Sequence, residues 1–263
     1  MYIVLTIISV FAIYYFFLIF PTQWLKIEHI HQPLNTGVRI LQISDLHVDM
    51  LRISPAKLRA IIERCAPDYI MLTGDYTSKS SSISRLERYF KTIAESQIPV
   101  YAVLGNHDYQ NAHFTQLLEL FEKLDIVLLR NESRQLKEIQ LVGIDDYSTG
   151  HSKVSDAFSS INTILERNVT VQSKPVVVIT HDPNVLTTVK NHYDYMMAGH
   201  FHGKQFNIPF FFRLKPKGVL PAKGVYKGLH KMEYGMLYIS KGIGQTGLNN
   251  RFMVRSEVTI HDL

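Results

Sequence analysis

The chain has 263 residues, with 28 Lys and Arg against 23 Asp and Glu, so its formal net charge is +5. Hydrophobic residues make up 46% and charged residues 19%, which excludes a disordered chain, because such chains are poor in hydrophobic residues. The single cysteine, Cys65, excludes a disulfide framework and any metal site built from Cys-x-x-Cys pairs. Any metal must therefore be bound by His, Asp, Asn or Glu.

Residues 1–20 form an apolar segment without a charged side chain. A helix of this length matches the roughly 30 Å hydrocarbon layer of a bilayer. The alternative, a cleaved signal peptide, would need a basic start, a shorter apolar core and a cleavage site with small residues. Pro21 ends the run, and Trp24 and Lys26 follow where interfacial residues are expected. The segment predicts a single-pass anchor in the cell membrane, and Lys26 and Arg39 favour a cytoplasmic catalytic domain.

After a short linker, residues 21–37, the chain has the pattern of an α/β protein. Apolar runs predict buried strands at residues 38–44, 68–73, 99–104, 126–129, 139–144 and 175–180. Helical spacing predicts helices at residues 54–66, 82–95 and 113–124. Ser54 and Pro55 suit the N-cap and first position of the first of these helices. Because no internal repeat interrupts the pattern, we expect residues 38–263 to form one domain.

Polar side chains directly follow four of the predicted strands. They occur in the sequences Asp45-Leu46-His47, Gly74-Asp75, Gly105-Asn106-His107-Asp108 and His181. In open α/β sheets, side chains from different strands converge at the carboxyl ends of those strands. We therefore expect a functional site at this edge.

Two more imidazoles, His200 and His202, lie one residue apart in a glycine-flanked turn. Alternate residues of an extended segment point the same way, so Asp45 with His47, and His200 with His202, can each reach one centre. Oxygen and imidazole ligands without sulfur suit Mn²⁺, Fe or Zn²⁺. Because about seven candidate ligands exceed what one ion needs, the sequence predicts two metal ions.

The ordered motifs DLH, GD, GNHD, a His after a strand and GHxH resemble the calcineurin-like metallophosphoesterase superfamily. The sequences at residues 142–146, 181–183 and 238–244 resemble its membrane-anchored bacterial YkuE-like branch. The resemblance covers residue 38 to about residue 252. It implies an α/β fold, a sandwich of two mixed sheets flanked by helices, with a dinuclear metal site at one end.

The resemblance also implies a role for each site residue. One metal would be bound by Asp45, His47 and His202, the other by Asn106, His181 and His200, and Asp75 would bridge both. His107 would contact the phosphate or protonate the leaving oxygen, and Asp108 would orient His107. The cofactors implied are two divalent ions, Mn²⁺ first, with Zn²⁺ or Fe as alternatives, and the reaction is an in-line attack on a phosphorus ester.

Some residues lie outside this pattern. Phe201 and Lys204 differ from the residues that close relatives often carry, and we expect both near the substrate entrance. We expect the histidines that match no motif to lie at the surface or in loops; they are His29, His31, His113, His151, His192, His230 and His261.

The segment at residues 206–231 interleaves aromatic and basic side chains. It could contact an anionic membrane surface or be ordinary strand and loop. Such a composition can also suggest nucleic-acid binding, but the predicted anchor and the lack of a second basic cluster make that the weaker interpretation.

The sequence therefore predicts a membrane-anchored phosphoesterase that hydrolyses a phosphodiester or diphosphate at the membrane surface. One anchored group that this chain resembles hydrolyses UDP-2,3-diacylglucosamine, whose acyl chains suit a bilayer and whose diphosphate suits the metals. The alternatives are a broad phosphodiesterase or phosphomonoesterase of unassigned substrate, and a catalytically silent membrane-bound binding protein. The expected partners are the lipid bilayer and a phosphate ester that can be lipid-linked, and no protein partner can be inferred from the sequence.

Overall fold

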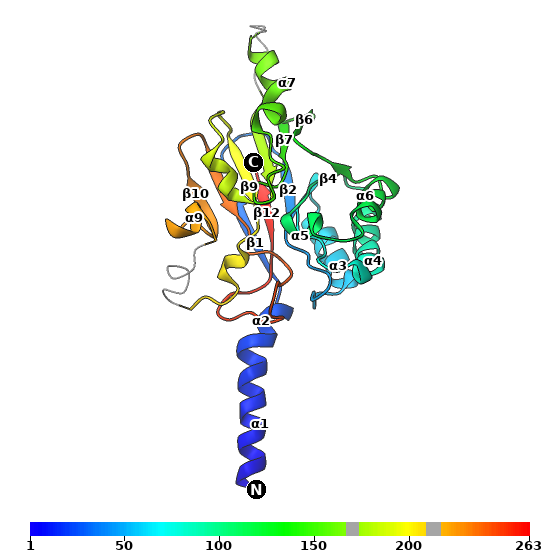
Figure 1. Ribbon diagram of the computed structural model, residues 1–263, viewed down its shortest axis with the longest axis vertical. Helices are drawn as coiled ribbons and strands as arrows, with labels where there is room; N and C mark the ends of the chain where they lie inside the picture. The colour runs from blue at the N-terminus through cyan, green and yellow to red at the C-terminus, as the bar shows by residue number, and fades with distance from the viewer. Residues whose placement is uncertain (167–173, 209–216) are drawn as a thin grey trace.

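The computed structural model describes residues 1–166, 174–208 and 217–263. Two six-stranded sheets stack face to face, helices cover their outer faces, and one long helix projects from the domain (Figure 1). The first sheet has the strand order β1-β12-β2-β3-β4-β5 and the second the order β10-β11-β9-β8-β7-β6. This arrangement confirms the predicted sandwich of two mixed sheets.

The strands of the first sheet are β1 (Lys26–His31), β12 (Glu257–Asp262), β2 (Arg39–Ile43), β3 (Tyr69–Thr73), β4 (Val100–Val103) and β5 (Val127–Leu128). Those of the second are β10 (Gly228–Lys231), β11 (Met236–Ile239), β9 (Tyr195–Ala198), β8 (Val176–Thr180), β7 (Gln140–Ile144) and β6 (Glu132–Gln135). The α-helices of the domain are α3 (Pro55–Cys65), α4 (Ile83–Ala94), α5 (Asn106–Tyr109), α6 (Phe114–Lys123), α7 (Val154–Glu166) and α9 (Val219–Ala222). Short 3₁₀ turns are η2 (Ser80–Ser82), η3 (Pro183–Thr187) and η4 (His202–Lys204).

All six predicted strands and all three predicted helices are present, with ends that differ by at most one residue. The Ser54 side chain caps α3, as predicted, by accepting a hydrogen bond from the Lys57 N–H at 3.2 Å. Strands β2, β3 and β4 run parallel, as do β7, β8 and β9. The carboxyl ends of these strands therefore lie at one edge of each sheet.

Alternation along the strands builds three apolar layers. Ile40 of β2 faces Ile179 of β8 across the space between the sheets, whereas Leu41 and Ile43 pack outward against α3, α4 and α6. Val178 packs on the outer side of the second sheet. This layering holds both sheets rigid beneath the edge that carries the polar residues.

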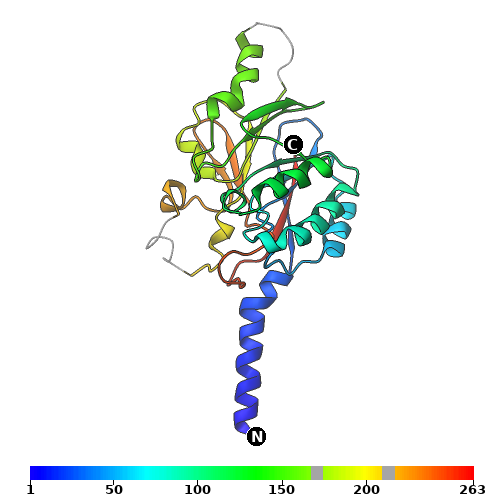
Figure 2. The ribbon, with the colours of Figure 1, turned by 45° about the vertical axis from the view of Figure 1, so that its right-hand side comes forward.

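The N-terminal helix is continuous through α1 (Tyr2–Tyr14), η1 (Tyr15–Ile19) and α2 (Phe20–Gln23), and its 22 residues could cross a membrane by length and composition (Figure 2). Pro21 lies inside the helix, which continues to Gln23, three residues beyond the predicted end of the anchor at residue 20. The wide π turn of η1 precedes Pro21, and such a turn makes room for a proline ring that would otherwise collide with a carbonyl of the preceding turn.

The segment at residues 21–37 is not a simple linker. Its strand β1 pairs in parallel with β12, from Lys26 opposite Glu257 to His31 opposite Asp262. The strand was not predicted because four of its six residues are charged or polar and its two apolar residues, Ile27 and Ile30, do not alternate as strand residues do. The sheet therefore begins directly after the apolar helix.

His261 is buried rather than exposed. Its Nδ1 lies 2.7 Å from the Tyr195 hydroxyl, and its Nε2 lies 3.1 Å from Oε1 of Gln42, so the ring joins the two sheets. Burial lowers the pKa of His261 to about 3. The other histidines outside the motifs are exposed or half-buried, as predicted: His29, His31, His113, His151, His192 and His230.

Candidate metal centre

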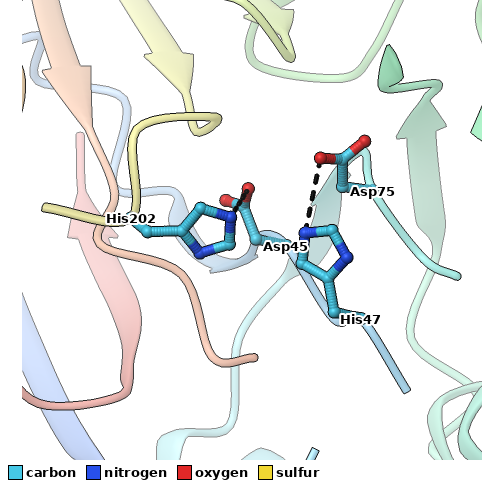
Figure 3. A group of neighbouring side chains, drawn as sticks. All are labelled: Asp45, His47, Asp75 and His202. Carbon is cyan, nitrogen blue, oxygen red and sulfur yellow. Dashed lines mark ion pairs between the residues drawn. The ribbon is translucent and has the colours of Figure 1, made fainter. Parts of the chain in front are cut away.

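A buried group of four side chains lies at the carboxyl ends of β2 and β3 (Figure 3). Each of Asp45, His47, Asp75 and His202 offers a ligand atom, and these atoms all lie within 4.8 Å of one another. Oδ2 of Asp75 is 3.4 Å from Nε2 of His47, and Oδ1 of Asp45 is 3.3 Å from Nε2 of His202. Two carboxylates and two imidazoles thus converge on one point, as the ligands of a cation do.

A second group shares Asp75 with the first. Ligand atoms of Asp75, His181 and His200 also lie within 4.8 Å of one another. Nε2 of His181 is 3.2 Å from Oδ2 of Asp75 and 3.1 Å from Nδ1 of His200. Asp75 therefore lies between two groups of imidazoles, which is the geometry of a bridging carboxylate.

Asn106 begins α5 beside the shared carboxylate. The neighbouring His107 N–H donates to Oδ1 of Asp75 at 2.9 Å. Among the described residues, three buried atoms of the site have no hydrogen-bond partner: Oδ1 of Asn106, Nε2 of His47 and Nδ1 of His202. Buried polar atoms without partners are rare in native proteins. A cation that accepts lone pairs would satisfy such atoms, so the residues fit a metal centre.

The backbone at the site is left-handed rather than extended. Positive φ angles occur at Asp45 (55°), His47 (37°), Asp75 (58°), His200 (75°) and His202 (51°). The expectation that alternate residues of extended segments deliver the ligands was therefore wrong about the local conformation. Such conformations cost about 1–3 kcal/mol each for residues other than glycine and cluster at functional sites.

Asp75 and His181 hold each other in the charged form. Burial opposes ionisation of the carboxyl, but His181 and His47 outweigh it and hold the pKa of Asp75 well below its usual range. Burial likewise opposes the charge on His181, yet Asp75 raises the pKa of that imidazole well above its usual value.

Two other imidazoles are held neutral. Burial, assisted by the charge of His181, lowers the pKa of His200 to about 3. Burial and the nearby His47 lower the pKa of His202 well below its usual value. A metal ligand must be a neutral imidazole, so these two rings are already in the required form.

The hydrogen bonds of Asp108 go to the backbone rather than to the ring of His107. Its carboxylate accepts backbone N–H groups of Gly105 and Asp75 at 2.8 Å and of Tyr76 at 2.7 Å. Burial and the charge of Asp75 raise the pKa of Asp108 to about 7. Asp108 thus joins the loops after β3 and β4, and no described hydrogen bond links it to the ring of His107.

His107 lies beside the first group, with its ring centroid 4.9 Å from that of His47. Its Nδ1 is 2.9 Å from Oγ of Ser78, and its Nε2 is 3.4 Å from Oγ1 of Thr246. Burial lowers the pKa of His107. Neither Ser78 nor Thr246 was predicted as a site residue, and Thr246 is 139 residues from His107 in the sequence.

Phe201 does not lie at a substrate entrance. Its side chain is buried in the apolar layer outside the second sheet. The Lys204 ammonium lies 4.3 Å from the ring centroid of Tyr226. Of the aromatic and basic segment at residues 206–231, residues 209–216 lie outside the described part of the chain.

A cavity of about 400 Å³ adjoins the second group of ligands. His200 and Lys217 lie in its wall, together with Tyr147, Asp182 and Val219. An open pocket therefore lies next to the second group of candidate metal ligands.

Residues 38–204, which contain every predicted ligand, match the family described as calcineurin-like phosphoesterase. The chain belongs to this family. It is a metal-dependent phosphoesterase, and members of the family use two divalent ions, in agreement with the two ligand groups that share Asp75.

The chain is similar to three named proteins. It is 34% identical to the uncharacterized metallophosphoesterase YkoQ of Bacillus subtilis, over 88% of this chain and 85% of YkoQ. It is 25% identical to a Danio rerio transmembrane protein with a metallophosphoesterase domain, over 89% of this chain and 55% of that protein. It is 23% identical to UDP-2,3-diacylglucosamine pyrophosphatase LpxG of Chlamydia muridarum, over 83% of this chain and 80% of LpxG.

Proposed function

We propose that this chain is a membrane-anchored, two-metal phosphoesterase that cleaves a phosphodiester or a diphosphate at the membrane surface. The observation that carries the proposal is the place of Asp75 in both ligand groups. One cation would be held by Asp45, His47, Asp75 and His202, and the other by Asp75, Asn106, His181 and His200. When bound, two divalent ions neutralise charge on the phosphoryl group and acidify the attacking water. Mn²⁺ is the proposed ion, and Zn²⁺ and Fe²⁺ suit the same ligands.

His107 is proposed as the residue that contacts the phosphoryl group or the leaving oxygen. When the Ser78 hydroxyl donates to Nδ1 of His107, Nε2 carries the ring proton and can donate a hydrogen bond to the phosphoryl or leaving oxygen. Asp108 is proposed to position this residue indirectly, because it holds the loop after β4 from which His107 projects.

The proposed substrate is UDP-2,3-diacylglucosamine. The similarity to LpxG supports this choice, as does the apolar helix, which would keep the enzyme where a diacylated substrate resides. A generic phosphodiester or phosphomonoester of unassigned identity is the alternative. The cavity beside His200 has room for a further part of such a substrate.

The catalytic domain is proposed to face the cytoplasm. Lys26 follows the helix, Lys57 donates to the Gln23 carbonyl at its end, and Arg255 lies over the Trp24 ring. Positive side chains near the end of a transmembrane helix favour the cytoplasmic side.

The test is release of UMP from UDP-2,3-diacylglucosamine in detergent micelles by the full-length protein with Mn²⁺. Asp75→Asn keeps the side-chain volume and tolerates a positive φ, so it removes chiefly a ligand charge. Asp125→Asn is the matched control, because Asp125 is exposed and also has a positive φ, of 54°. We expect UMP from the native protein and from Asp125→Asn, and none from Asp75→Asn.

Hydrolysis of bis-p-nitrophenyl phosphate by the same samples tests the phosphoesterase activity independently of the proposed lipid substrate. Cleavage of this generic diester without UMP release would reject the lipid substrate and keep the phosphoesterase. Equal hydrolysis by the native protein and Asp75→Asn would reject the proposed ligand set.

A further inference from the structure

The apolar helix is hydrogen-bonded directly to the catalytic domain and is not connected to it by a flexible linker alone. The Arg251 N–H donates to the Leu18 carbonyl at 3.0 Å, and the Ser256 N–H donates to the Pro21 carbonyl at 3.0 Å. Arg52 also donates to the Thr22 hydroxyl at 3.1 Å. The position of the helix in a bilayer would therefore fix the position of the domain next to it.

The segment at residues 247–253, named here the 247–253 loop, lies alongside the helix itself. Rings of Phe252 and Phe17 lie 6.4 Å apart, and the Asn250 amide donates to the Tyr14 hydroxyl at 3.3 Å. Figures 1 and 2 both show the red segment before β12 beside α2 at the foot of the domain. The loop thus lies beside the last turns of the N-terminal helix that could cross a membrane.

The contacts set the depth of this loop relative to the helix. Leu18 lies five residues before the end of the helix at Gln23, which corresponds to about 8 Å along the axis. The whole helix is about 33 Å long, close to the hydrocarbon thickness of a bilayer. When the helix spans, the Leu18 carbonyl therefore lies roughly 6 Å inside the edge of the hydrocarbon layer, and a loop bonded to it reaches past the headgroups to the acyl chains.

The 247–253 loop exposes large apolar side chains at this level. Leu248 is 65% and Met253 is 68% exposed, although most of the large apolar side chains of the domain are buried. Neighbouring exposed apolar residues beside an apolar helix indicate a membrane-contact surface. Trp24, also exposed, lies under the Arg255 guanidinium at 3.5 Å, an aromatic and cationic pair suited to anionic headgroups.

The segment that joins β11 to the 247–253 loop passes beside the candidate metal centre. The Gly244 N–H donates to the Asp45 carbonyl at 2.8 Å, and the Thr246 hydroxyl lies 3.4 Å from Nε2 of His107. The Gln205 side-chain amide donates to the carbonyls of Thr246 and Leu248 and so fixes the start of the loop. Only a few residues separate the ligand loop from the exposed apolar tip.

We propose that the 247–253 loop is a second membrane-contact element, inserted among the headgroups of the bilayer beside the helix, with Leu248 and Met253 in contact with acyl chains. The proposal rests on the anchor role of the helix given under the proposed function. It places the metal centre at headgroup level, so that a phosphate ester of a lipid reaches it without leaving the bilayer.

The experiment measures depth in the membrane by fluorescence. The full-length protein is reconstituted in vesicles that contain phosphatidylcholine and phosphatidylglycerol, after Leu248→Cys or Met253→Cys has been labelled with an environment-sensitive dye. The native Cys65 is buried and burial raises its pKa, so protein without an added cysteine serves as the blank. Lys137→Cys is the exposed control, since that side chain is 89% exposed at the opposite end of the second sheet, and Phe11→Cys reports the helix.

Lipids with spin labels near the headgroup should quench dyes at positions 248 and 253 at least about threefold more than the dye at position 137. Lipids labelled deep in the acyl chain should quench the dye at position 11. If position 11 is quenched while positions 248 and 253 behave like position 137, the proposal is overturned and the anchor stands. If position 11 is not quenched, both the anchor and the proposal fail, whereas hydrolysis of a soluble diester still reports the phosphoesterase separately.

Discussion

At the scale of single residues, the site depends on side chains held in conformations that the backbone disfavours. Asp45, Asp75 and His202 are among five candidate ligands with positive φ. Their strain is offset by hydrogen bonds from neighbouring loops, such as that from the His107 N–H to Asp75. Residues that bind no metal can therefore still control the metal centre.

His107 and Asp108 are adjacent in the sequence, but substitution of His107 should lower the reaction rate, whereas substitution of Asp108 should lower metal affinity. His107→Ala should lower kcat for bis-p-nitrophenyl phosphate by about 10²–10⁴-fold, as expected for loss of a proton donor, with metal content unchanged. Asp108→Ala should weaken metal binding by about 10–100-fold, because three backbone N–H groups lose their acceptor. Chelator titration with metal analysis separates the two effects. Loss of metal from His107→Ala, or its full retention in Asp108→Ala, would contradict these roles.

At the scale of elements, the connection after β11 packs on the loop after β2. The Ile243 N–H donates to the Ser44 carbonyl at 2.9 Å, directly before the ligand Asp45. Gly242 has a φ of +70°, and a Cβ atom there would lie 2.8 Å from Cβ of Asp45. The close approach of these two loops therefore requires glycine.

Gly242→Ala should displace Asp45 and weaken metal binding by at least about tenfold. Gly150→Ala is the control, because Gly150 has a similar φ of +78° but open space around its Cα. The control should lose only about 1 kcal/mol of stability through its backbone conformation. Calorimetric titration with metal measures the affinity of both variants. Equal metal affinity in the two would contradict the claim that the close contact of Gly242 with Asp45 is needed for metal binding.

The six predicted strands lie in apolar runs, but apolar composition was not enough to find every strand, because β9 and β11 are also apolar and were not predicted. Strand β8 is a continuous apolar run between two covered faces. Strand β12 instead contains Glu257 and Thr259, which bond to the Tyr238 hydroxyl, and His261, which bonds to the Tyr195 hydroxyl, and both tyrosines belong to the second sheet. The polar side chains of β12 are buried only because the second sheet supplies partners. The order of motifs after strands revealed the seven candidate ligands. The contacts of Asp108 could not be predicted, because its partners are backbone N–H groups, which no sequence pattern displays.

At the scale of the whole molecule, a polar layer joins the two sheets. His261 on β12 contacts Gln42 on β2 and Tyr195 on β9. This layer makes the packing of the sheets sensitive to acid, because a buried neutral imidazole resists protonation.

The stability of the native protein should fall as the pH is lowered below about 6.5, the ordinary pKa of histidine. The folded-state pKa of His261 is about 3, so between these values the unfolded chain binds a proton that the folded chain does not. At pH 5 this costs about 2 kcal/mol relative to pH 8.

Thermal unfolding followed by near-UV circular dichroism at pH 8 and pH 5 tests this linkage. His261→Gln should show a smaller difference between the two pH values than the native protein, and the exposed His113→Gln should behave as the native protein does. An unchanged difference in His261→Gln would show that His261 does not carry the linkage.

The most direct test of the central claim is a count of metal ions per chain in the purified full-length protein, made together with hydrolysis of bis-p-nitrophenyl phosphate. Native protein and Asp125→Asn should each hold about two divalent ions per chain and cleave the diester. Asp75→Asn should lose bound metal and at least about a hundredfold in hydrolysis, since Asp75 belongs to both ligand groups. A single ion per native chain, or undiminished hydrolysis by Asp75→Asn, would contradict a metal pair bridged by Asp75.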